Sequence, residues 1–244
     1  MGKLKSVAVG LYLGIAAIGL TSISAQAGPL PVLIDFTGDT AGMSPALGGA
    51  NQPTAIFNPA GTTVLGQSSA NGLATKPLEV TVPAASTFTG WRYNFDTPVS
   101  SQIVIVESTF SMNRLFDGIF FQTGTSAGPL INQLFARANG DIIAPEFFGT
   151  GASGPVVGTY AANSPFRIRM DIDVGAGSWS FTVDDELNGF LDDTTLTGLN
   201  FVNDPMIISD VGALFGTISA APTLAFDFPV SVAYDDISAT ALGV

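Results

Sequence analysis

The alternation that decides the fold runs through residues Phe166 to Asp185, FRIRMDIDVGAGSWSFTVDD. If Val174 to Gly177 form a loop, each residue of the first half acquires a partner in the second half. In that register the apolar residues share one face: Ile168, Met170, Ile172, Trp179, Phe181 and Val183. The polar residues share the other face, where Arg167 lies opposite Asp184. Because one register satisfies burial and charge together, the stretch predicts an antiparallel β-hairpin with one buried face.

Further short alternating runs, separated by Gly, Pro, Asn and Asp, predict more strands along the chain. These strands are expected over Pro31–Phe36, Leu78–Val82, Trp91–Phe95, Gln102–Phe110, Phe116–Gln122, Leu134–Ala138, Asp141–Ile143 and Phe226–Leu242. Asn139-Gly140 predicts a two-residue hairpin turn. The unbroken apolar run Ile103–Val106 predicts a central strand covered on both faces. Ala41–Gly72 and Gly149–Ala162 lack a strong period and are expected to form long loops with some strand in them. No helix-period segment of useful length is found, so the predicted fold class is all-β.

The first 27 residues have the pattern of a secretory signal peptide. Lys3 and Lys5 precede an apolar stretch over Ser6–Leu20, and Ala25-Gln26-Ala27 fits a small-x-small cleavage site. The apolar stretch is shorter than the roughly 20 residues that span a bilayer. We therefore expect a secreted, periplasmic or extracellular protein without membrane insertion after removal of residues 1–27. Residues 28–244 then form a single sandwich domain.

The charge balance limits the partners. The chain has 8 basic and 20 acidic residues, so loss of Lys3 and Lys5 leaves 6 basic residues and a net charge of −14. Nucleic acid and anionic lipid surfaces are poor partners for such a protein.

The missing residue types constrain the chemistry further. The chain has no histidine and no cysteine, which removes Ser-His-Asp and Cys-His catalysis and the usual zinc sites. Gly124–Gly128 matches a G-x-S-x-G nucleophile elbow only formally, because the histidine base does not exist. A glycosidase would need a carboxylate pair, and the four glutamates show no such pattern: Glu79, Glu107, Glu146 and Glu186. A metal-free lyase would need a Tyr or Lys base, and no flanking pattern supports one at Lys76, Tyr93, Tyr160 or Tyr234. We therefore predict a protein that is not an enzyme, with a polysaccharide hydrolase as the alternative.

Four segments carry a resemblance to a known family. They are LIDFTGDTAGMSP (residues 33–45), LFARANGDII (134–143), the hairpin from Phe166, and VAYDDISATAL (232–242). The chain resembles the concanavalin A-like lectin/glucanase domains, with laminin-G-like jelly rolls, of bacterial exported proteins. The resemblance implies a two-sheet antiparallel jelly-roll β-sandwich whose first and last strands are neighbours. It also implies functions that range from glycan binding to polysaccharide cleavage, although the Glu-x-Asp-x-x-Glu motif of the glucanases is missing here.

The same resemblance implies a calcium ion where the terminal strands meet. The carboxylates available there are Asp35 on the first strand and Asp235 and Asp236 on the last. Alternation changes phase at the two adjacent aspartates, which predicts a β-bulge that re-aims one of them. Calcium prefers several oxygen ligands, so a structural site of Asp35, Asp235 and Asp236 is one hypothesis. The alternative is that these aspartates protect an exposed sheet edge.

Aromatic residues offer a second kind of site, a platform for sugars. Trp91, Tyr93 and Trp179 share faces with apolar residues, so alternation assigns them to the core. A glycan site would then use the polar faces. Its candidate residues are Arg92, Asn94, Arg167 and Arg169. A solvated face of salt bridges explains these side chains equally well.

These observations predict a secreted, non-catalytic binding module for extracellular or cell-surface carbohydrate, stabilised by calcium if the aspartate site exists. A structural protein of the extracellular matrix or cell surface is the competing class.

Overall fold

The computed structural model describes residues 31–49, 51–57, 61–83, 88–99, 103–124, 130–145, 154–191, 193–201, 211–220 and 229–242. The predicted leader, residues 1–27, lies outside this described part of the chain. The described residues form strands, turns and loops, and none of them belongs to a helix long and apolar enough to cross a bilayer.

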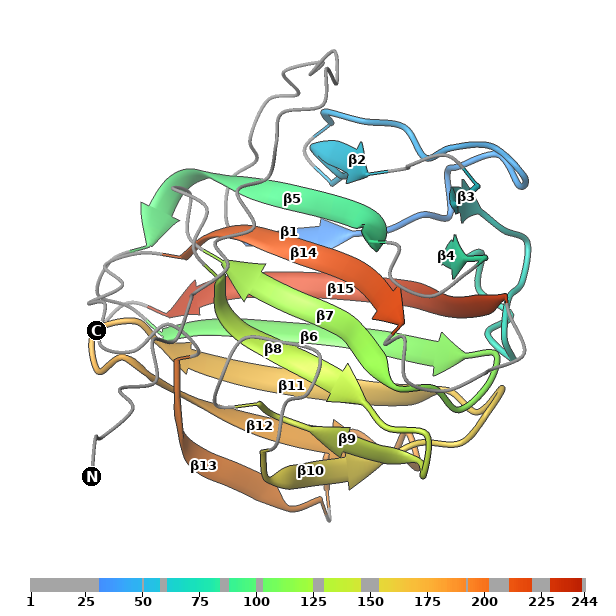
Figure 1. Cartoon of the computed structure of the whole chain (residues 1–244). Helices are drawn as coiled ribbons and strands as arrows, with labels where there is room; N and C mark the ends of the chain where they lie inside the picture. The colour runs from blue at the N-terminus through green and yellow to red at the C-terminus, as the bar shows by residue number, and fades with distance from the viewer. Residues whose placement is uncertain are drawn as a thin grey trace, which may run out of the picture.

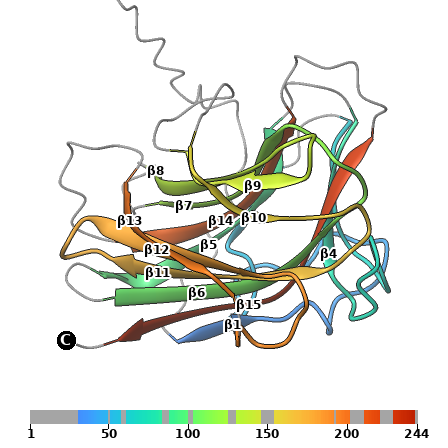
Figure 2. The same ribbon diagram turned by 90° about the horizontal axis from the view of Figure 1, so that it is seen from below.

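Two antiparallel sheets stack face to face, as Figure 1 and the view from below in Figure 2 show. The eight-stranded sheet has the order β13 (Thr195–Asn200), β12 (Ser178–Asp184), β11 (Phe166–Asp173), β6 (Ile103–Met112), β15 (Val230–Leu242), β4 (Leu78–Val82), β3 (Thr63–Gly66), with β1 (Val32–Ile34) also paired to β15. The seven-stranded sheet has the order β10 (Val156–Thr159), β9 (Asp141–Ile143), β8 (Leu130–Ala136), β7 (Gly118–Gly124), β14 (Val211–Ala220), β5 (Phe88–Val99), β2 (Ala55–Phe57). The predicted all-β sandwich is therefore confirmed.

The β11–β12 hairpin has the register that its alternation predicts. Arg167 pairs with Asp184, Met170 with Phe181, and Ile172 with Trp179. Every second residue of β11 is buried, beginning with Phe166. The hairpin therefore turns one face to the core and the other to solvent.

The terminal strands are neighbours, as the resemblance implies. Val32 of β1 pairs with Ala239 of β15, and Ile34 pairs with Ile237. The predicted bulge is also present, because the pairing of β15 with β6 shifts register between Asp235 and Ser238. Asp236 has a φ of 47°, in the left-handed region.

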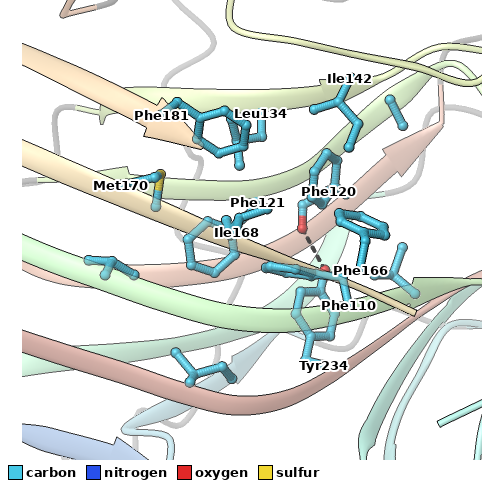
Figure 3. Close-up of a cluster of buried hydrophobic side chains, with 14 of the residues drawn as sticks. Phe110, Phe120, Phe121, Leu134, Ile142, Phe166, Ile168, Met170, Phe181 and Tyr234 are labelled. Atoms are coloured by element: carbon cyan, nitrogen blue, oxygen red, sulfur yellow. Dashed lines mark hydrogen bonds between the residues drawn. The ribbon is translucent and has the colours of Figure 1, made fainter. Parts of the chain in front are cut away.

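The core between the sheets is rich in aromatic residues. Phe110 of β6 contacts Phe120, Phe121, Phe166 and Tyr234, with ring centroids 5.3–5.7 Å apart (Figure 3). The Tyr234 hydroxyl donates to the Phe120 carbonyl at 2.7 Å, so this buried polar group is satisfied. Tyr234 lies on β15 and Phe120 on β7, and this bond therefore joins the two sheets.

Two predictions of detail are wrong. Ile103–Val106 is central, between β11 and β15, but only Val104 and Val106 are buried, and Ile103 and Ile105 are half-buried on the outer face. An antiparallel sandwich covers each sheet on one side only, which explains the difference.

The turn at Asn139-Gly140 has three residues rather than two. Gly140 N donates to Arg137 O at 2.9 Å, Arg137 N donates to Asp141 O at 2.8 Å, and Gly140 has a φ of 92°. This is the geometry of a tight turn followed by a left-handed glycine. Asn139 keeps a negative φ and instead bonds Asp141 through its side chain.

Candidate functional site

The three aspartates of the calcium hypothesis lie on the neighbouring segments where β1 meets β15. Asp35, directly after β1, accepts hydrogen bonds from Thr37 N at 2.7 Å and Thr37 Oγ1 at 2.9 Å. Asp235 is buried and accepts from Thr75 Oγ1, whereas Asp236 is exposed. Burial raises the pKa of Asp235, and the charges of Asp236 and Asp35 raise it further against the opposing hydrogen bond from Thr75. Within the described residues no three acidic side chains converge into a group that could hold a metal ion, so calcium stays a prediction.

The four residues predicted to bind glycan do not form one surface. Arg167 and Arg169 lie on β11, in the eight-stranded sheet, and Arg92 and Asn94 lie on β5, in the seven-stranded sheet. Each pair alternates with residues that face the core, so the two pairs lie on opposite outer faces of the sandwich.

On the eight-stranded sheet both guanidinium groups are engaged in ion pairs. Arg167 Nη2 lies 2.5 Å from Glu107 Oε2, and Arg169 lies 3.3 Å from Glu107 Oε1 and 3.0 Å from Asp171 Oδ1. This matches the salt-bridged face that the sequence left open as an alternative.

On the seven-stranded sheet Arg92 is half-buried beside the edge strand β2. Its guanidinium carbon lies 5.5 Å from the centroid of the Phe57 ring. Burial lowers the pKa of Arg92. Thr54 fixes the local backbone, because Thr54 N donates to Arg92 O at 2.7 Å and Asn94 N donates to Thr54 Oγ1 at 3.2 Å.

The strand register places two glutamines on the same outer face as Arg92. Phe215 of β14 pairs with both Arg92 and Gln122, and Gln122 pairs with Gln133 of β8. Residues paired directly across antiparallel strands project to the same side. Arg92, Gln122 and Gln133 therefore lie on one row, here called the polar row, that crosses the sheet from β5 to β8, and Phe215 of β14 occupies the position between Arg92 and Gln122. This sheet is the front layer of Figure 1.

Three amide atoms of these two buried glutamines lack hydrogen-bond partners. Gln122 is 2% exposed and Gln133 is 0% exposed. Gln122 Nε2 and both amide atoms of Gln133 accept and donate no hydrogen bond. Buried polar groups in native proteins are nearly always satisfied, so these three atoms need a partner, and either a water molecule or a ligand group can supply one.

The opposite face of the same two strands is different. Thr123 and Asn132 pair with one another and point into the core, where Thr123 Oγ1 donates to Asn132 Oδ1 at 2.6 Å. Asn132 Nδ2 on this inner face is also unmatched.

An apolar row lies beside the polar row. Ile119, Phe135 and Ile143 form a cluster separate from the main core, in register across β7, β8 and β9. The guanidinium carbon of Arg137 lies 5.0 Å from the Phe135 ring centroid, and Arg137 Nη1 lies 3.9 Å from Asp117. A few polar groups at defined positions beside an apolar surface are typical of ligand sites.

Few of the described side chains on this sheet are carboxylates. Among its described side chains the one carboxylate is Asp141 on β9, which accepts from Asn139 Nδ2 at 2.7 Å. Glu79 and Glu107 belong to the other sheet, where Glu79 accepts from Gln67 Nε2 at 3.0 Å. The described part of the seven-stranded sheet therefore presents no pair of carboxylates for glycoside hydrolysis.

The aromatic residues that the sequence assigned to the core are there. Trp91 and Tyr93 are fully buried, and Trp179 donates from Nε1 to Asn200 O at 3.0 Å. They are therefore not a sugar platform.

The glutamines are the candidate residues that the sequence reasoning missed. The available signal was an amide inside each of two strands that are otherwise almost wholly apolar or small, GIFFQTG and LINQLFA. Sequence alone could not show that these two strands are adjacent and in a register that aligns the amides.

No family model matches this sequence, and no curated protein matches it. Among solved structures, a sialidase superimposes with a TM-score of 0.56 and 8% identity, over 76% of this chain and 16% of the sialidase chain. An alginate lyase from Klebsiella pneumoniae has a TM-score of 0.47 and 13% identity over 69% of this chain and 82% of its own. Lectin II from Ulex europaeus has a TM-score of 0.46 and 10% identity over 78% of this chain and 100% of its own.

At such identities the similarity concerns the fold, since one fold hosts many functions. The present chain corresponds to only a small part of the sialidase. Together with the sheet order and the adjacent terminal strands, the comparison shows that this protein has the concanavalin A-like jelly-roll fold.

Proposed function

We propose that the protein is a secreted, non-catalytic module that binds extracellular or cell-surface carbohydrate on the outer face of its seven-stranded sheet. The observation that carries the proposal is the pair of buried, unmatched amides of Gln122 and Gln133. A saccharide offers hydroxyl groups at its edges and C–H groups on its faces. Gln122 is 2% exposed and Gln133 is 0% exposed, so this face must open before the two amides can bond the hydroxyl groups and the apolar row beside them can contact the C–H groups.

The absence of histidine and of a carboxylate pair in the described part of this sheet supports binding rather than cleavage.

The test is a glycan-array screen of the purified protein, with reducing-sugar assays run on the polysaccharides that bind. The doubly substituted variant Gln122→Leu/Gln133→Leu should lose binding, because the donors and the acceptor are removed while side-chain volume is kept. Thr123→Val, on the inner face of the same strand, is the matched control and should bind like the wild type.

Binding that survives the double substitution contradicts the proposed surface. Release of reducing ends would instead make the protein a hydrolase, and a protein that neither binds nor cleaves belongs to the structural class.

A further inference from the structure

A small hollow opens where the two sheets meet at β10 and β12, two strands beyond the end of the polar row (Figure 1). β10 packs directly on β12, because a Cβ added to Gly158 would lie 2.4 Å from Val183 Cγ2. β10 ends at Thr159, β11 begins at Phe166, and Asp185 directly follows β12. The hollow at these strand ends has a volume of about 180 Å³. Sites for drug-sized ligands have about 300–1,000 Å³, so this hollow suits a group the size of one sugar ring.

The loop between β10 and β11 supplies most of the lining and is fixed by hydrogen bonds. Tyr160 N donates to Gly140 O at 2.8 Å, and Asn163 N donates to Met112 O at 2.7 Å. The Tyr160 hydroxyl accepts from Phe116 N at 3.0 Å and donates to Phe116 O at 3.2 Å. The hydroxyl is therefore used inside the protein, and only the ring of Tyr160 lines the hollow.

The loop after β12 supplies Asp185 and is held in a strained conformation. The buried carboxylate of Asp184 accepts from the backbone N–H groups of residues 188–190 at 2.8–3.3 Å. Leu187 and Phe190 have φ of 56° and 65°, in the left-handed region that bulky side chains rarely adopt. Strain of this kind persists only where the surrounding structure enforces it, and it gathers at functional sites. Asp185 is thus positioned before a ligand arrives, which lowers the cost of binding.

Three polar side chains of the lining have no partner within the described part of the chain. They are the exposed side chains of Thr159, Ser164 and Asp185. A carboxylate only accepts hydrogen bonds, whereas each hydroxyl donates one and accepts others. A complementary ligand must therefore carry several donors together with some acceptors, and the adjacent hydroxyl groups of a sugar provide both.

The rest of the lining is apolar. Ala161 is exposed and Pro165 half-buried, and Tyr160 and Phe166 are 7% and 1% exposed, so they offer only small parts of their rings. Together these atoms form a small surface against which C–H groups can pack.

Charge selects among the ligands that this lining could take. None of the described residues that line the hollow is basic, and Glu186 beside Asp185 is also exposed. An anionic ligand would therefore be repelled. A cationic ligand would gain little from Asp185, because ion pairs in water contribute little. A neutral ligand with several hydroxyl groups fits best.

We propose that this hollow is a second carbohydrate site, which binds one neutral sugar residue. Two adjacent hydroxyl groups of the ring donate to the Asp185 carboxylate, and the hydroxyl groups of Thr159 and Ser164 bond further oxygens of the ring. The C–H groups of the ring lie against Pro165. The site is separate from the polar row and does not require the sheet face to open, so it is tested independently of the proposed function.

Saturation-transfer NMR with the methyl glycosides of glucose, galactose and mannose tests the site, and 1,4-diaminobutane is the cationic probe. A ligand of this size at an exposed hollow should bind with a Kd of about 1 mM. Affinity this weak is not retained on a glycan array, so the array result concerns the polar row alone. At least one glycoside should bind the wild type. Failure of all three glycosides, or binding of the diamine alone, would overturn the proposal.

Substitutions assign the binding to the hollow. Asp185→Asn should weaken binding of the glycoside by about tenfold or more, because the charged acceptor is lost. Glu186→Gln is the matched control: it removes the same charge from the next residue, which does not line the hollow, and it should leave affinity unchanged. Gln122→Leu/Gln133→Leu should also bind the glycoside like the wild type.

Wild-type affinity in the Asp185→Asn variant, or equal losses in the Asp185→Asn and Glu186→Gln variants, would refute the role of Asp185. Loss of glycoside binding in Gln122→Leu/Gln133→Leu would place the sugar on the polar row instead of in the hollow. The melting midpoints of all variants establish that each is folded.

Discussion

Replacing Gln133 by leucine should make this protein more stable. Gln133 is fully buried and both of its amide atoms lack partners. Each buried, unmatched polar group costs about 1–3 kcal/mol. Leucine has a similar volume and no polar atoms, so we expect Gln133→Leu to raise the free energy of unfolding by about 2 kcal/mol. For a domain of this size that corresponds to a rise of about 4–8 °C in the melting midpoint.

Urea denaturation followed by tryptophan fluorescence gives the free energy directly. Thr123→Val is the contrasting variant on the other face of β7. It removes the 2.6 Å bond to Asn132 Oδ1 and leaves that buried acceptor unmatched, so stability should fall by about 1–3 kcal/mol.

A Gln133→Leu variant that is less stable than the wild type would refute the reasoning, because the amide must then have a partner in the free protein. A variant that gains stability and loses carbohydrate binding would have the signature of a residue retained for ligand contact at the expense of stability.

Three further predictions concern other parts of the fold. Because the pKa of Asp235 is raised in the folded state, its contribution to stability is complete below about pH 4, the usual carboxyl value, and is lost as pH rises through the raised pKa. Asp235→Asn should therefore flatten the fall in melting midpoint with rising pH; parallel curves for variant and wild type would contradict this. The calcium hypothesis predicts that EDTA lowers the wild-type midpoint by several degrees, and an unchanged midpoint would remove it. Gly158→Ala should lower the free energy of unfolding by about 1–3 kcal/mol, because the new Cβ would lie 2.4 Å from Val183 Cγ2. If urea denaturation gives the Gly158→Ala variant the same free energy of unfolding as the wild type, Val183 must move aside for the new methyl group.

Local alternation was sufficient for much of the architecture. The hairpin register, the burial of Trp179 and the bulge at Asp235 follow from period-two patterning, because a shift by one residue would reverse every side chain. The pairing of the first strand with the last came from the family resemblance rather than from alternation.

Other local details depended on geometry that the sequence does not state. The Asn139-Gly140 pair fits two turn types, and the backbone adopted the longer one, with Gly140 in the left-handed region. The apolar run Ile103–Val106 is covered by the other sheet on one side only, so Ile103 and Ile105 remain half-buried on the outer face.

By itself, then, the sequence determined which side chains share a side of each strand, and hence the layered all-β fold and its apolar interior. Only the tertiary structure decided which residues from different strands share an outer face. It separated Arg92 from Arg167 by the thickness of the sandwich and aligned Gln122 with Gln133. The physical reason is that alternation is a local property of a strand, whereas the neighbours of a strand are chosen by contacts between residues far apart in the chain.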